Sequence, residues 1–172
     1  YQLRVEYRFD GEQARGGPAW ALRTSGVMFH AQSPESILVE QDFPISLEAQ
    51  FLGGNGIDER PRANLCTPGT HVHMERELVE QHCITAAAPT VHGDEWVTFD
   101  LLVLGDSLIV HIMDGDTVLE YSRPVIGGGV VDGFDETVKE DGRPLTGGYI
   151  ALQSESHPVQ FRQVLLRRLP SR

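Results

Sequence analysis

Acidic, amide and imidazole side chains occur two residues apart in several short segments of this sequence. Glu48 and Gln50 form one such pair, and apolar residues alternate with them at Leu47, Ala49 and Phe51. Residues two apart on a β-strand project from the same face, so the polar pair and the apolar set would lie on opposite faces. The same spacing places other residues together on one strand face: Met28 with His30, His71 with His73 and Glu75, Ile109 with His111, and Gln153 with Glu155. Strands of this kind, side by side on one concave sheet, would form a groove lined by carboxylates, amides and imidazoles.

These residue types suit acid-base chemistry on a polar ligand. A carboxylate such as that of Glu48 and imidazoles such as those of His73 and His111 can exchange protons with a ligand, so this groove is a plausible catalytic floor. His71 and His73 also have the spacing by which two imidazoles on one strand bind one divalent metal ion, which makes such an ion a candidate cofactor. For each residue the alternative is an ordinary solvated strand face or, for His111, a surface position beside a hairpin.

The aromatic and remaining histidine residues allow simpler interpretations. Trp20 and Trp96 could stack on sugar rings, but filling the core of a sandwich is the competing role for both. His82, His92 and His157 lie among turn-forming residues, which predicts loop positions.

Apolar residues repeat with a period of two along most of the chain. Leu3, Val5, Tyr7 and Phe9 alternate with polar residues, as in a half-buried strand. The pattern predicts strands at 3–9, 26–31, 45–52, 69–75, 96–104, 107–113, 117–121, 148–153 and 159–168, and a long loop at 122–146. Residues 74–81 fit either a short helix or two strands joined by a turn. Many short strands and little helical periodicity predict an all-β fold, an antiparallel double-sheet sandwich or jelly roll.

Length and charge limit the class of protein. The 172 residues suit a single domain over 1–172, and the formal net charge is −11. A strongly acidic chain is repelled by nucleic acid and by anionic membrane surfaces, so neither is an expected partner. No apolar run approaches the roughly 20 residues of a membrane span.

Cys66 and Cys83 are the two cysteines of the chain. They form either a disulfide or two buried thiols, and the turn residues around them favour closure of a loop by a disulfide. A disulfide would contribute on the order of 3 kcal/mol and predicts an oxidising compartment, in a secreted or periplasmic protein.

Several segments resemble the 3-keto-disaccharide hydrolase domain family. The segment at 147–162, GGYIALQSESHPVQFR, is similar to the end of that domain, and 24–30, TSGVMFH, is similar to its NSGIxFR strand. Residues 45–50 resemble its xxExQ strand, and Glu95-Trp96 with Asp114-Gly115 resemble its EW…NG hairpin. Thr24 stands where the family usually has Asn, and His30 where Arg is common. The resemblance implies a concanavalin-like jelly roll that lacks the family's opening segment, which supplies an early strand.

The resemblance also implies an unusual cleavage of glycosides. Most glycosidases use two carboxylates that flank the bond, and Glu48 with Glu155 is the evident pair here. A keto group at C3 acidifies the C2 proton, so the bond can break by C2 proton abstraction and elimination, followed by hydration. The implied catalytic residues are Glu48, His73 and His111: the base would be Glu48 or a histidine, and His73 or His111 would be the acid or a metal ligand. The implied substrate-binding residues are His30, Gln50, His71, Trp96, Gln153 and Glu155, and the partner is an oxidised glycoside.

Two other classes of protein remain open from the sequence. A non-catalytic carbohydrate-binding domain could use the same concave face, because one fold often serves both purposes. A structural or adhesion module would need no convergent polar groups. The oligomeric state is not readable from the residues.

Overall fold

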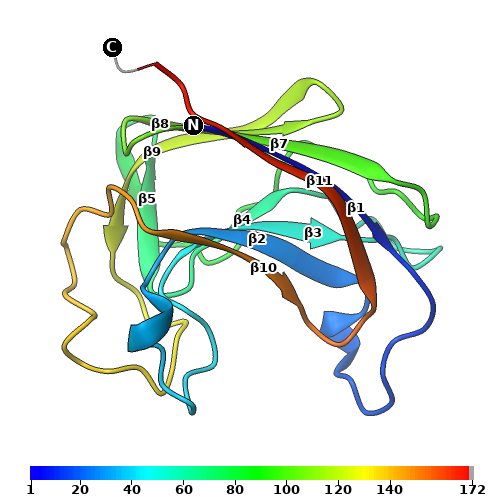
Figure 1. Cartoon of the computed structure of the whole chain (residues 1–172), viewed down its shortest axis with the longest axis horizontal. Helices are drawn as coiled ribbons and strands as arrows, with labels where there is room; N and C mark the ends of the chain where they lie inside the picture. Colours follow the sequence, from blue (N-terminus) through cyan, green and yellow to red (C-terminus); the bar gives the residue numbers. More distant parts are fainter. Residues whose placement is uncertain (171–172) are drawn as a thin grey trace.

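Two antiparallel β-sheets pack face to face in the computed structural model, which describes residues 1–170 (Figure 1). The larger sheet has the order β11-β1-β7-β8-β9-β5-β6, and the smaller has the order β10-β2-β3-β4. The strands are β1 (Gln2–Phe9), β2 (Thr24–Ala31), β3 (Leu47–Leu52), β4 (Asn64–Cys66), β5 (Thr70–Met74), β6 (Glu77–Val79), β7 (Val97–Leu104), β8 (Leu108–Met113), β9 (Asp116–Ile126), β10 (Tyr149–Ser154) and β11 (Val159–Arg167). The predicted all-β, double-sheet sandwich is therefore confirmed.

The core lies between the sheets and consists of the alternating apolar residues of both. Leu47, Ala49 and Phe51 of β3 are fully buried, as the period of two predicts. The ring of Phe51 stacks on that of Tyr7 from β1, with ring centroids 4.0 Å apart. Burying side chains of this size contributes roughly 1.5 to 3 kcal/mol each. A shift of one residue along β3 would move these side chains outward and Glu48 into the core, so the register is strongly determined.

Three local predictions needed correction or refinement. Asn64–Cys66 forms a strand that the alternation did not indicate, because three residues are too few to show a period. Residues 74–81 are not helical: β5 and β6 form a hairpin, with Glu75 and Arg76 at positive φ in its turn. Strand β9 continues to Ile126, so the predicted loop at 122–146 begins five residues later than expected.

Loops extend past the outer face of the smaller sheet on both sides (Figure 1). One carries the short 3-10 helix η1 (Ala19–Ala21), and another carries η2 (Pro34–Ser36). A second small apolar cluster joins Val131 of the loop after β9 to Ile126 at the end of β9 and to Ile45 before β3. Within residues 1–170, no helix has the length and apolar character needed to span a membrane.

Candidate active site

Two carboxyl groups share one amide on the outer face of the smaller sheet. Glu48 lies on β3 and is only 4% exposed, with Met28 of β2 and Cys66 of β4 as its cross-strand neighbours. Gln153 of β10 donates hydrogen bonds from Nε2 to Glu48 Oε1 at 2.7 Å and to Glu155 Oε1 at 2.9 Å. The amide therefore holds two carboxyl groups from distant parts of the chain at one place.

Gly26 makes this arrangement sterically possible. It lies on β2 between Gln153 of β10 and Gln50 of β3. A Cβ atom at Gly26 would lie 2.4 Å from Glu48 Oε1 and 3.0 Å from the Ala49 carbonyl oxygen. The absence of a side chain on β2 thus leaves the space in which the Glu48 carboxyl group meets Gln153.

Burial sets the protonation of both carboxyl groups. It raises the pKa of Glu48 to about 8, because the charged form loses hydration; the Gln153 hydrogen bond opposes this rise and the charge of Glu155 adds to it. Burial also raises the pKa of Glu155, against the effect of its own bond from Gln153. Raised carboxyl pKa values in a polar pocket are typical of acid-base catalysts.

A pocket of about 200 Å³ opens directly over these groups. Its walls combine polar, aromatic and sulfur-containing side chains: Trp20, Phe43, Glu48, Gln50, Cys66, Pro68, His82, Cys83 and Glu155. Trp20 is 64% exposed, so its ring is available to a ligand. Gln50 accepts a 3.4 Å hydrogen bond from Asn64 on Oε1. Convergent polar groups beside an aromatic surface suit a sugar ring.

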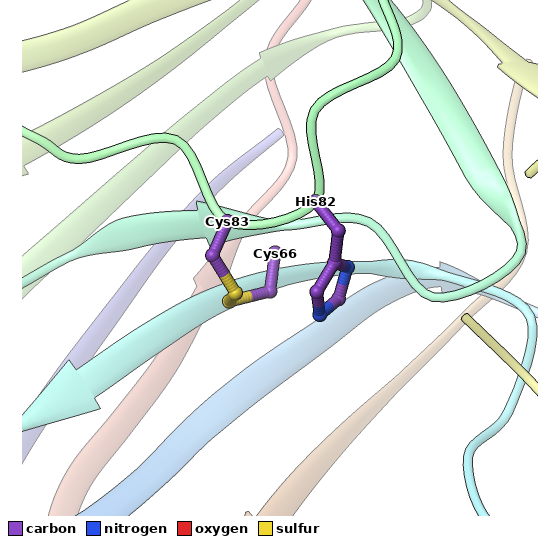
Figure 2. A group of neighbouring side chains, drawn as sticks. All are labelled: Cys66, His82 and Cys83. Carbon is purple, nitrogen blue, oxygen red and sulfur yellow. A yellow bond between two sulfur atoms is a disulfide. The ribbon is translucent and has the colours of Figure 1, made fainter.

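The predicted disulfide between Cys66 and Cys83 is confirmed, and it forms part of the pocket wall (Figure 2). It belongs to a short ladder between two segments. Leu65 and Ile84 exchange two backbone hydrogen bonds, and the Thr67 N–H donates to His82 Nδ1 at 3.2 Å. Leu65 is thus joined to Ile84, Cys66 to Cys83 and Thr67 to His82. The disulfide is compatible with an extracellular or periplasmic protein.

His82 is a pocket residue that the sequence analysis assigned to a loop. Its imidazole extends beside the disulfide and on the same side of the chain (Figure 2). Burial lowers its pKa. Because Nδ1 accepts the Thr67 N–H, the neutral ring carries its proton on Nε2. The only sequence signal for its placement was its position next to a cysteine.

His71 and His73 do not lie in this pocket, contrary to expectation. Both are on β5 of the larger sheet, where Val72 between them is fully buried, so their side chains face away from the core. His73 Nδ1 donates to the Arg123 carbonyl at 2.9 Å, and the His71 ring packs against Gly127. The period of two placed the pair on one face correctly, but it could not show which sheet carries them.

His111 and His30 were also misplaced. His111 is completely buried between the sheets, where Nδ1 donates to the Ala63 carbonyl at 2.8 Å and Nε2 accepts from the Tyr121 hydroxyl at 2.9 Å. It is a core residue and neither a catalytic acid of this pocket nor a surface residue. His30 has φ 49° and sits where the β10–β2 register shifts. It is 3% exposed and packs on Phe29, away from the walls of the Glu48 pocket.

The structure separates the two tryptophans, and neither fills the core between the sheets. Trp96 immediately precedes β7 of the larger sheet, and the guanidinium groups of Arg8 and Arg162 cover its ring at 4.9 and 4.1 Å. It is therefore engaged with arginines outside the Glu48 pocket. Trp20 is neither buried nor part of the core and lines the pocket instead.

One group of three potential metal-binding side chains occurs within residues 1–170: Cys66, His82 and Cys83. The two sulfur atoms are bonded to each other, so they are not thiolate ligands. The divalent ion suggested by the spacing of His71 and His73 stays a prediction.

The antiparallel double-sheet architecture is that of a concanavalin-like sandwich, and a pocket lined by both polar and apolar side chains lies on its smaller sheet. A family model described as the 3-keto-alpha-glucoside-1,2-lyase-like domain matches residues 1–167, and the chain belongs to this family. The family name refers to a domain that acts on a carbohydrate. A search of curated proteins gave no match.

Proposed function

We propose that this protein cleaves 3-keto-glycosides, 3-keto-disaccharides among them, by elimination across C1 and C2 followed by hydration. The observation that carries the proposal is the pair of buried carboxyl groups, Glu48 and Glu155, held by Gln153 in a pocket of a domain from this family. The disulfide supports a secreted or periplasmic location for this activity.

Glu48 is the general base in this proposal. Its ionised carboxylate takes the C2 proton, which the C3 ketone acidifies, and the C2–H electron pair forms the enolate. The electrons then return from the enolate oxygen, the C1=C2 bond forms and the C1–O bond breaks. Water later adds across C1=C2, with its oxygen at C1 and a proton at C2. A buried carboxylate with a raised pKa is a stronger base than an exposed one.

Glu155 supplies the proton that the departing oxygen requires. It is the second carboxyl group of the pocket, and burial raises its pKa, so it keeps a proton to higher pH than an exposed glutamate. The two groups titrate as a pair, and the single proton can lie on either of them; the reactive form is the one in which Glu48 is ionised and Glu155 holds the proton. Gln50 binds a substrate hydroxyl, and Trp20 stacks on a sugar ring at the mouth of the pocket.

A carbohydrate-binding domain without catalysis is the second candidate. The exposed Trp20 beside polar groups favours it, because aromatic platforms hold sugars without any chemistry. The two candidates differ in their dependence on the oxidised sugar.

The first test compares a 3-keto-glucoside with its unoxidised parent. We expect release of the aglycone from the keto compound alone, because only the C3 ketone acidifies C2. Chromatographic detection of the aglycone measures this release. Equal cleavage of both compounds would indicate a conventional glycosidase. Binding of either sugar without any cleavage would indicate the carbohydrate-binding domain.

The pH dependence of the reaction tests the state of Glu48. With a nitrophenyl 3-keto-glucoside, whose leaving group needs no acid, kcat/KM should rise with pH and level off above about 8, as Glu48 ionises. Glu155→Gln removes a charge that opposes this ionisation, so the midpoint should move to lower pH. The same variant should lose more activity on an alkyl 3-keto-glucoside than on the nitrophenyl compound. An unchanged midpoint and equal losses would contradict the assignment of Glu155.

A further inference from the structure

Elimination next to a ketone places negative charge on the C3 oxygen, and the two carboxyl groups are already assigned to the C2 proton and the leaving oxygen. A hydrogen-bond donor aimed at this oxygen is therefore needed, and such donors typically contribute 10²- to 10³-fold in rate. The polar side chains that line the pocket are Glu48, Gln50, His82 and Glu155. Gln50 accepts from Asn64 on Oε1, and its Nε2 group is assigned above to a substrate hydroxyl, so the imidazole of His82 is the further N–H donor of the pocket.

We infer that His82 is a catalytic residue of the proposed reaction, donating its Nε2–H to the C3 oxygen of the keto sugar as the enolate forms. The inference rests on the proposed function and adds the group that polarises the ketone. In the step, Glu48 gains the C2 proton, the C2–H electrons form C2=C3, and the ketone π electrons move to the oxygen that His82 holds. His82 keeps its proton throughout.

The ladder beside the pocket fixes this donor. Nδ1 accepts the Thr67 N–H at 3.2 Å, so the neutral ring must present a hydrogen on Nε2. The adjacent Cys83 is covalently joined to Cys66, which pairs with Glu48 across β3 and β4. The segment that carries His82 is therefore tied to the strand that carries Glu48 by the disulfide and by the pairing of β4 with β3. A neutral imidazole suits the role, because it polarises a carbonyl by hydrogen bonding and does not protonate it.

The substitution His82→Phe tests the inference, because it keeps a ring beside the disulfide and removes the N–H. His92→Phe is the matched control: His92 Nδ1 also accepts a backbone N–H, from Gly56 at 3.0 Å, but His92 is not a pocket residue. His82→Gln restores an N–H donor without the ring. Circular dichroism and thermal unfolding establish that each variant is folded.

The probe is the 3-keto derivative of 1,5-anhydroglucitol, which carries no aglycone at C1. Proton NMR in D₂O follows exchange at C2 and so isolates proton abstraction. We expect His82→Phe to slow exchange and the turnover of a 3-keto-glucoside by about 100-fold or more, with a much smaller change in KM. His92→Phe should stay within about threefold of the wild type, and His82→Gln should recover roughly tenfold over His82→Phe.

Exchange by His82→Phe within about threefold of the wild type would overturn the role of His82 and leave the proposed function standing. Equal losses in His82→Phe and His92→Phe would show a structural effect and overturn it as well. A wild-type protein that neither exchanges C2 nor cleaves the keto-glucoside would overturn the proposed function and this inference together. If His82→Phe fails to fold, the His82→Gln variant tests the inference in its place. A His82→Gln variant whose turnover is about 100-fold or more below that of the wild type, with a normal KM, would contradict donation by an N–H at this position.

Discussion

The Glu48→Gln variant should turn over a 3-keto-glucoside at least about 100-fold more slowly than the wild type, on the usual scale for loss of a general base. Glutamine has nearly the same shape, and Glu48 accepts its hydrogen bond from Gln153 on one oxygen, so the pocket should stay formed. The fold should persist because Leu47 and Ala49 on either side remain buried. Initial rates at several pH values up to 9 measure the loss.

Glu120→Gln provides the control for this experiment. Glu120 is an exposed carboxylate on β9 of the larger sheet, so the same change of charge occurs outside the pocket. Its turnover should match that of the wild type. A Glu48→Gln variant that keeps more than about a tenth of the wild-type rate would contradict the role of Glu48 as the base. Glu155 would then be the candidate base.

Replacing His111 with phenylalanine should lower the free energy of unfolding by about 2 to 4 kcal/mol at pH 7. An aromatic ring of somewhat larger volume is kept, but the Ala63 carbonyl and the Tyr121 hydroxyl lose their buried partner, and each orphaned group costs about 1 to 3 kcal/mol. Urea unfolding measures the difference. His73→Phe is the control, because His73 lies on the outer face of β5, and it should change stability by less than about 1 kcal/mol.

The same variant should change the pH dependence of stability. Burial lowers the pKa of His111 from 6.5 to about 4, so the unfolded chain binds a proton more readily than the folded one. The wild type therefore loses stability as pH falls from about 6.5 through 4, by on the order of 3 kcal/mol. His111→Phe lacks this group, so its deficit relative to the wild type should shrink over that window. A deficit that is constant with pH would contradict the neutral, doubly bonded imidazole.

The strands and the carboxylate face could be predicted because alternation is a local property. Alternation places Glu48 and Gln50 on the face of β3 opposite to Leu47 and Phe51. It likewise places Gln153 of β10 and Glu155 of the following turn on one face. The structure brings all four polar residues to one face.

The histidine positions depend on non-local information. Alternation groups His111 with Ile109 but does not say that this face turns inward, and it does not assign His71 and His73 to a sheet. His82 enters the pocket through the pairing of 65–67 with 82–84, in which β4 is only three residues long. A disulfide prediction brings Cys83 to Cys66, but the rotation of the neighbouring imidazole depends on the Thr67 N–H.

A 3-keto-glucoside with deuterium at C2 tests the central claim most directly, because the proposed cleavage begins with loss of that atom. The wild-type protein should react more slowly with the deuterated compound than with the protiated one, and the sugar product formed in H₂O should have lost label from C2. Mass spectrometry of the product and initial rates of aglycone release give both results. Equal rates together with full retention of the label would contradict C2 proton abstraction, and Glu48, Glu155 and His82 would then be carbohydrate-binding residues.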